Sequence, residues 1–285
     1  RSLPELSSWV SSKSDIEVFA AGRSGLGGRP TSATELCGDL GNLPVLRAVQ
    51  GFLRNRPPGR PWFTTVGLRG LRELDPWARA QSSKGPPVDL GLAPRQLPGL
   101  PTTLRAGLPE AELLRAHSPS PADWSDAHWQ SALWQSARAL EGMDGLIERL
   151  LSSLDASLHG ANTLVVLTAA QGSPLGRHGR LRPGDLREGS LRVPLAVRCP
   201  WTRPAEAIGL PVSTLDLAPT VCAVLGLPDL PEARGIRLRS LLDGHPAPSR
   251  PMVFSEGFVE GHSVRSREFR FSTWRDGTSP SLVHL

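Results

Sequence analysis

The sequence has 285 residues, of which 39% are hydrophobic and 21% charged, and a formal net charge of +5. This composition supports a large buried core and excludes a disordered tail. The arginines are scattered singly and Lys13 and Lys84 are the two lysines. Nucleic-acid binding needs positive charge clustered on one face, so we expect a solvated, arginine-rich surface and no nucleic-acid partner.

The cysteines and the hydropathy exclude further kinds of protein. Cys37, Cys199 and Cys222 are odd in number, widely spaced and without a CxxC pair, which argues against a zinc knuckle and against a disulfide scaffold. We expect them to be small, buried apolar residues. No apolar run reaches the roughly 18 residues that a transmembrane helix needs, and the opening RSLP is not a signal peptide. The sequence therefore predicts a soluble chain with no membrane partner, or a piece of a longer protein, and leaves its compartment open.

The first third of the chain alternates helix and strand signals. A buried strand is predicted at 17–21 and runs into a glycine-rich turn at 22–28. Helical periodicity over 43–55 precedes a second strand at 62–66. Residues 76–121 are rich in Pro, Gly and Leu without a clear period. We expect this insert to be a long covering loop of the kind that often carries substrate contacts.

The strongest predicted helix begins at the capping pair Ser125-Asp126 and extends to about residue 150, with Trp129 and Trp134 in its packing stripe. It precedes an almost continuously apolar strand at 161–168, a pattern typical of a strand buried on both faces of a parallel sheet. Chemistry in such a sheet lies at the carboxyl end of the strand. Residue 168 and its followers are therefore the place to look for a site.

The alternation continues with a strand at 191–198 and a helix at 213–226, closed by a glycine and expected to be capped by Asp216. From residue 251 the pattern changes to short β-like runs separated by turns. We predict an α/β fold with a mostly parallel central sheet flanked by helices and a small antiparallel C-terminal subdomain. The predicted division is a domain at 1–245, which carries the insert, and a subdomain at 246–285.

Five motifs follow one another in an order that resembles the sulfatase family of the alkaline-phosphatase-like superfamily. NTLVVLTAAQG at 162–172 is similar to its strand and T-S-D-H-G motif, and LGRHG at 175–179 to its L-G-E-H-G motif. RVPL at 192–195, LDLAPT at 215–220 and VRSREFRF at 264–271 are similar to three later motifs. The insert looks most like the iduronate-2-sulfatase and choline-sulfatase side of the family.

The resemblance implies hydrolysis of a sulfate ester by a formylglycine, matured from the Cys of C-x-P-S-R, beside a calcium ion. This chain has no C-x-P-S-R and lacks the family's first strand with its paired aspartates, so we expect it to be N-terminally incomplete. The motif T-S-D-H-G corresponds to TAAQG at 168–172, which puts Ala170 in place of the calcium-binding aspartate and leaves Gln171 as a weak, neutral ligand. We therefore expect the calcium site to be lost.

Arginines occupy several positions that contact sulfate in the family. G-K-W-H-L-G corresponds to residues 22–27, where Arg23 keeps the positive charge, and Arg72 stands where a sulfate-facing histidine would lie. The family's lysine aligns near Arg182. His178 is the best-matched polar residue, with a hydrogen-bonding surface role as the alternative to catalysis. The candidate anion-binding residues are therefore Arg23, Arg72, His178 and Arg182.

Three functions remain open from the sequence. The first is hydrolysis of sulfate esters, and the second is binding of a sulfated or other anionic small molecule or glycan by an inactive relative. The third is a structural remnant with a partner at the sheet edge that a missing first strand would expose. Asp185 and Glu188 are expected to be solvated loop charges, with remote calcium ligation as the alternative.

Overall fold

The structure, a computed structural model, describes most of the chain in two compact units. The described residues are 6, 9–10, 12, 16–22, 34–36, 42–70, 91, 96–104, 124–181, 183–202, 208–245, 250–256, 261–274, 277 and 280–285. The first unit contains 1–69, 143–166 and 197–250, and the second contains 70–142, 167–196 and 251–285. The boundary near residue 245 stays a prediction, and most of the insert lies outside the described residues.

Helices and strands alternate along the described residues as the sequence predicts. In chain order they are β1 Glu17–Gly22, β2 Thr34–Leu36, α2 Asn42–Asn55, β3 Trp62–Gly67, α6 Asp126–Asp155, η2 Gly160–Asn162, β4 Val165–Thr168, η3 Arg177–Gly179, α7 Glu188–Leu191, β5 Leu195–Arg198, η4 Thr214–Asp216, α8 Leu217–Val224, α9 Arg239–Leu242, β6 Val253–Glu256, β7 Gly261–Arg265, β8 Phe269–Trp274 and β9 Ser281–His284. The strands predicted from 161 and 191 begin later, because a 3-10 helix and α7 occupy their first residues.

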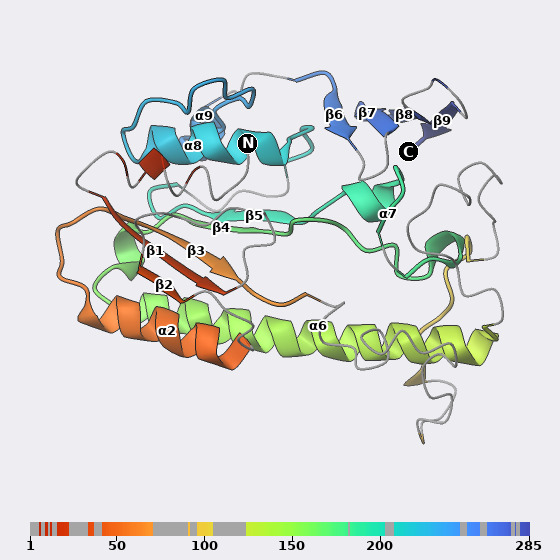
Figure 1. The fold of residues 1–285 in the computed structure, drawn as a ribbon, viewed down its shortest axis with the longest axis horizontal. Coiled ribbons are helices and arrows are strands. Elements are labelled where there is room, and N and C mark those ends of the chain that lie inside the picture. The colour runs from red at the N-terminus through yellow and green to blue at the C-terminus, as the bar shows by residue number, and fades with distance from the viewer. Residues whose placement is uncertain are drawn as a thin grey trace. The chain divides into compact units, whose positions relative to one another are not determined.

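The first unit is built on a parallel sheet of order β2-β1-β3. Side chains of a strand point alternately to its two faces, and β1 uses both. Phe19 and Ala21 pack in a buried cluster with Val45 and other residues of α2, which lies along one side of the sheet (Figure 1). Val18, directly before Phe19 in sequence, packs in a second cluster with Cys222 of α8. Helices therefore cover both faces of β1, which confirms the predicted α/β fold.

Asp216 anchors the start of α8. Its Oδ2 accepts a hydrogen bond of 2.8 Å from the backbone N–H of Ser213, in a capping box whose N-cap residue is Ser213. The cap is therefore Ser213 and not Asp216 as predicted, since the Asp216 side chain makes no capping bond at α8 itself. The side chain is fully buried. Its Oδ1 accepts from the N–H of Ile236 at 2.8 Å and pairs with Nη2 of Arg250 at 2.7 Å. One carboxylate thus ties three separate stretches of the first unit together.

The helix α6 confirms the strongest helical pattern of the sequence. Ser125 Oγ accepts a hydrogen bond from the backbone N–H of His128 at 3.5 Å, as a capping residue does. Trp129 is buried, and Trp134 is half-buried with the Arg138 guanidinium 5.7 Å from its ring centre. None of the described helices, α6 included, is both long enough and apolar enough to cross a membrane.

Of the two cysteines that the structure describes, Cys222 is buried as predicted and Cys199 is not. Cys222 is fully buried, and burial raises the pKa of its thiol. Cys199 is half-buried, and its sulfur accepts a hydrogen bond of 3.1 Å from Thr202 Oγ1. Cys37 lies outside the described residues. The Cys222 thiol is therefore protonated and unreactive at neutral pH.

The strand β4 departs from its prediction. The continuous apolar run predicts burial on both faces, but Val165 and Val166 are half-buried and Leu167 is 42% exposed. An apolar run shows strand propensity without showing what covers the strand. Among the residues that the structure describes, β5 is the one strand that pairs with β4.

The second unit contains the predicted antiparallel C-terminal sheet, with strand order β6-β7-β8-β9. Several of its apolar side chains are exposed, while many of its buried side chains are polar. Phe254, Val264, Phe271 and Leu282 are directly paired neighbours across the four strands, and three of them are exposed, Phe254 at 70% and Leu282 at 68%. The buried positions of β7 and β8 are instead mostly polar and include Ser263, Arg270 and Ser272. The sheet therefore turns arginine and hydroxyl groups toward the interior of its unit.

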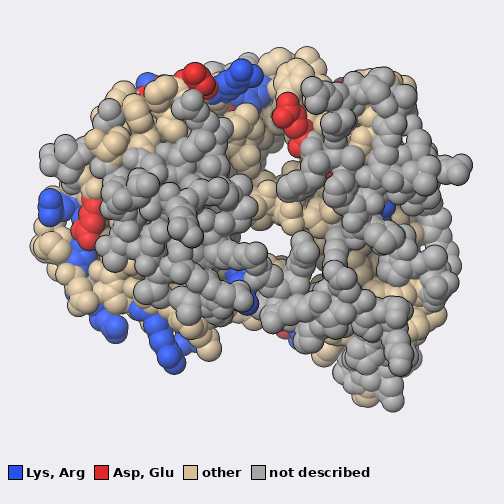
Figure 2. Space-filling model, viewed as in Figure 1, with Lys and Arg blue, Asp and Glu red and all other residues tan. Residues whose placement is uncertain are grey.

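The described charges show no large basic surface on the face in Figure 2. The described Arg side chains lie there in separate groups, with Asp and Glu side chains near several of them. The described residues on this face therefore form no continuous positive band of the kind that tracks a nucleic-acid backbone.

Replacement of Asp216 by alanine tests the anchor at α8. The change leaves the Arg250 guanidinium and two backbone donors without their acceptor, so we expect a loss of about 3 kcal/mol or more in the free energy of unfolding. Urea denaturation measures it. Asp229→Ala is the control, because its ion pair with Arg237 is exposed, and it should change stability far less. Equal effects of the two variants would contradict the anchoring role.

Candidate functional site

The carboxyl end of β4 is where the sequence places the site. Thr168 Oγ1 donates a hydrogen bond of 2.9 Å to the Pro194 carbonyl, just before β5. Gln171, in a bend after the strand, is exposed, and His178, in η3, is half-buried. Both belong to the second unit. Arg23, Arg72 and Arg182 lie outside the described residues, so two of the predicted site residues are placed in one unit.

The loop that carries His178 is tightly turned. Gly176 and Gly179 have φ of 82° and 65°, and the non-glycine residues Leu175 and His178 have φ of 48° and 53°. Left-handed backbone is uncommon for side chains other than glycine and persists where surrounding contacts hold it. Here the Gly176 N–H donates to the Arg180 carbonyl at 2.8 Å, and the His178 N–H donates to the Thr103 carbonyl at 3.0 Å. These bonds fix the backbone on both sides of the imidazole.

A close backbone approach joins the Gln171 bend to the segment that precedes β5. The Gly172 N–H donates to the Ser190 carbonyl at 2.9 Å. A Cβ on Gly172 would lie 2.3 Å from the Gly189 carbonyl oxygen and 2.7 Å from that of Arg192. A side chain does not fit there, so glycine at 172 allows the two segments to touch.

A buried ion pair lies within the same loops. Arg180 is 2% exposed and Asp185 is 9% exposed, with Nε and Oδ2 3.8 Å apart. Asp185 Oδ1 accepts hydrogen bonds from Ser190 Oγ at 2.6 Å and from the Arg187 N–H at 3.1 Å. The prediction that Asp185 is a solvated loop charge is therefore wrong. The local backbone turns its carboxylate toward these donors, and the spacing of charges in the sequence does not reveal that turn.

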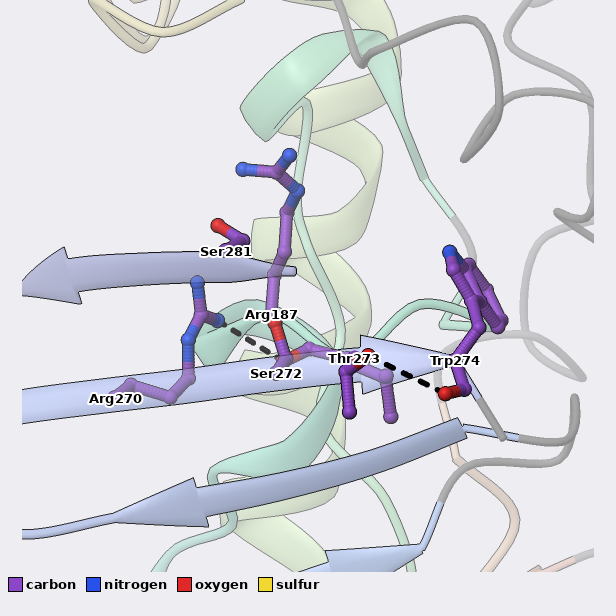
Figure 3. Close-up of a pocket in the computed structure, with 7 residues that line it drawn as sticks. Arg187, Arg270, Ser272, Thr273, Trp274 and Ser281 are labelled. Atoms are coloured by element: carbon purple, nitrogen blue, oxygen red, sulfur yellow. Dashed lines mark hydrogen bonds between the residues drawn. The ribbon is translucent and has the colours of Figure 1, made fainter. Parts of the chain in front are cut away.

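The C-terminal sheet supports the stretch that follows Asp185. Arg270 of β8 donates from Nη1 to the Leu186 carbonyl at 3.0 Å, and Arg265 of β7 pairs through Nε with Glu188 Oε1 at 3.1 Å. Glu188 is half-buried in this pair, so its prediction as a solvated charge is also wrong. A small pocket opens where the sheet meets this stretch (Figure 3), and it is lined by Leu186, Arg187, Arg270, Ser272, Thr273, Trp274 and Ser281.

The comparison with protein families decides the assignment. The family model described as sulfatase matches residues 45–227, which is more than half of the chain. The chain belongs to the sulfatase family. Among curated sulfatases it is 28% identical over 153 residues to arylsulfatase K of Danio rerio, a match that covers 50% of this chain and 29% of that protein. It is 35% identical over 124 residues to steryl-sulfatase of Rattus norvegicus, a match that covers 38% of this chain and 21% of that protein. This sulfatase-family chain thus matches less than a third of the length of these relatives.

Solved sulfatases share its fold. A putative sulfatase from Bacteroides thetaiotaomicron superposes with a TM-score of 0.81 at 19% identity, over 98% of this chain and 67% of that chain. A protein solved in complex with its substrate, D-glucosamine-2-N,6-O-disulfate, superposes with a TM-score of 0.66 at 17% identity, over 99% of this chain and 74% of that chain. At these identities the likeness shows the alkaline-phosphatase-like fold alone.

The metal that sulfatase membership implies can be tested against the side chains after β4. Calcium takes six to eight oxygen ligands, usually with carboxylates among them. Ala170 has no side-chain oxygen, and Gln171 offers one neutral carbonyl. Within the described ranges, no three His, Cys, Asp or Glu side chains come close enough together to hold a metal ion. The described residues therefore do not fit a calcium ion, and we derive no chemistry through one.

The buried pair Arg180–Asp185 is the feature of this region that the sequence prediction missed. The charge content gave no signal for it, because residues 177–192 hold five arginines and two carboxylates and charged side chains are exposed by default. Which of them are buried depends on the left-handed turns of the loop, and no sequence pattern gives those.

Two glycine-to-alanine changes within the second unit test the close approach at Gly172. Gly172→Ala forces a methyl group against backbone carbonyls, so we expect a loss of about 2 kcal/mol in the free energy of unfolding. Gly142→Ala is the control, because its Cβ in α6 meets nothing within 4 Å. Alanine is the better helix former, so this variant should gain about 0.5 to 1 kcal/mol. Chemical denaturation measures both, and a Gly172→Ala protein as stable as the wild type would refute the contact.

Proposed function

We propose that this sulfatase-family chain binds a sulfated or otherwise anionic ligand, such as a sulfated sugar, without hydrolysing it. The observation that carries the proposal is Ala170, an internal position where the family motif has a metal-binding aspartate. The 285 residues also contain no C-x-P-S-R from which a formylglycine could be matured. Transfer of a sulfuryl group needs charge stabilisation on its oxygens, and Ala170 offers no carboxylate to hold a cation for that purpose.

Arginines offer a way to hold the anion without a metal. The planar guanidinium presents donors that match the oxygens of a sulfate group in pairs. Residues 177–192 carry five arginines and one histidine against two carboxylates, and the described contacts neutralise those carboxylates with Arg180 and Arg265. In this proposal the ligand is bound by His178 and Gln171 with Arg23, Arg72 and Arg182.

The ligand class rests on the relatives. The superposed protein that was solved with D-glucosamine-2-N,6-O-disulfate has this sulfated amino sugar as its substrate. A site that keeps the shape of the family and replaces its metal by arginines would favour the same kind of group. Sulfated glycan fragments are therefore the first ligands to test.

Replacement of Arg72 by alanine tests the binding site. We expect the wild-type chain to be stabilised against heat by a sulfated disaccharide, and Arg72→Ala to weaken that affinity about tenfold, because a charge-assisted hydrogen bond is lost. Arg47→Ala, an exposed arginine of α2, is the matched control and should bind as the wild type does. Thermal unfolding at a series of ligand concentrations gives the affinities.

A failed binding test or an enzymatic activity would contradict the proposal. The first is a wild-type chain that the sulfated disaccharide does not stabilise, or an affinity that Arg72→Ala leaves unchanged. The second is calcium-dependent release of sulfate from an aryl sulfate by the purified chain, which would make it an active sulfatase.

A further inference from the structure

Three stretches of the proposed site converge on one carboxylate. The Gln171 bend is tied through Gly172 to the Ser190 carbonyl, and Ser190 Oγ donates to Asp185 at 2.6 Å. The His178 loop is closed by the bond from Gly176 to the Arg180 carbonyl, and the Arg180 side chain pairs with the same Asp185. Asp185 therefore connects the segment before His178, the segment after it and the residues that lead to β5.

We propose that Asp185 and Arg180 are positioning residues, which hold the His178 loop in the geometry that receives the anion. The inference rests on the proposed function, since it assigns a role within the same site. Neither residue is proposed to touch the ligand, because both side chains are almost fully buried. They act through the backbone that their contacts fix.

The energetics give the pair a role other than stability alone. Removing two charges from water costs several kcal/mol for each ion, and apolar residues of similar volume often stabilise a fold as well or better. The Nε–Oδ2 separation of 3.8 Å is long for an ion pair. Asp185 Oδ1 accepts two shorter hydrogen bonds, one from Ser190 Oγ and one from the Arg187 N–H. The pair therefore fixes the conformation of the loop more than it adds to the free energy of unfolding.

The loop needs the contacts of Asp185 because its backbone is strained. Left-handed φ at Leu175 and His178 costs free energy at each residue. The Gly176–Arg180 bond, which closes the loop, keeps its geometry while the Arg180 side chain stays anchored. Release of that anchor allows the loop to relax, and the imidazole of His178 would move with it.

The anchor is itself supported from the far end of the chain. Arg270 and Arg265 hold Leu186 and Glu188, which follow Asp185 closely in sequence. The polar inward face of the C-terminal sheet is thereby explained, because its arginines fix the stretch that carries the buried carboxylate. Positioning of the proposed site thus extends from β7 and β8 through Asp185 to His178.

Asp185→Asn tests the inference. The variant keeps an oxygen for Ser190 and Arg187 but removes the charge that Arg180 pairs with. We expect hydrogen exchange at the Gly176 amide to quicken about tenfold, with the amides of α2 unchanged, and the affinity for the sulfated disaccharide to fall about tenfold. Asp155→Asn is the matched control, since it makes the same change in an exposed pair with Arg198, and it should alter neither measurement.

A second variant separates positioning from folding. The double change Arg180→Met with Asp185→Asn leaves no unpaired buried charge, so its stability should return close to that of the wild type. We expect fast Gly176 exchange and weak binding to persist in it, because the anchor is still absent. If slow Gly176 exchange and wild-type affinity both return together with the stability, the inference is overturned.

The two claims fail in different ways. If the wild-type chain does not bind the sulfated disaccharide, the proposed function fails, and the exchange rate at Gly176 alone decides whether Asp185 holds the loop. If the wild type binds and Asp185→Asn binds equally well, the positioning role is wrong while the proposed function stands.

Discussion

A carboxylate that is removed from water needs hydrogen-bond donors or cations around it. Asp185 is such a buried carboxylate in the second unit. Arg180, Ser190 and the Arg187 N–H surround it. The loops that satisfy the carboxylate are those that follow β4 and carry Gln171 and His178. Their close packing, down to the backbone contact that requires glycine at 172, follows from this one constraint, and Asp216 plays the same part for α8 in the first unit.

The chemistry of the site follows from which groups the chain keeps. Hydrolysis of a sulfate ester needs a hard cation, and in the proposed function Ala170 stands where the family motif has one of its ligands. What the chain keeps is a family fold and a stretch rich in arginine. Guanidinium groups bind sulfate oxygens without activating them for transfer. The proposed function, recognition of an anion, rests on these groups.

The fold could be predicted where the pattern is local and long. The periodicity of α2 and α6 comes from side chains that alternate between core and solvent, the apolar run of β1 comes from burial on both of its faces, and all three elements are confirmed. Strand β2, with three residues, and β9, which follows a turn, give no such pattern. The site residues were harder, since burial of Asp185 and Glu188 depends on turns and on strands far away in sequence. Of the predicted contacts, Gln171 and His178 are described in one unit, and the arginines stay predictions.

Titration calorimetry of the chain with inorganic sulfate, once in EDTA and once in calcium, tests the central claim most directly. The account predicts saturable binding of similar affinity in both, because arginine and histidine donors hold the anion and no metal takes part. Binding that appears in calcium and vanishes in EDTA would contradict it, since a metal would then be holding the sulfate.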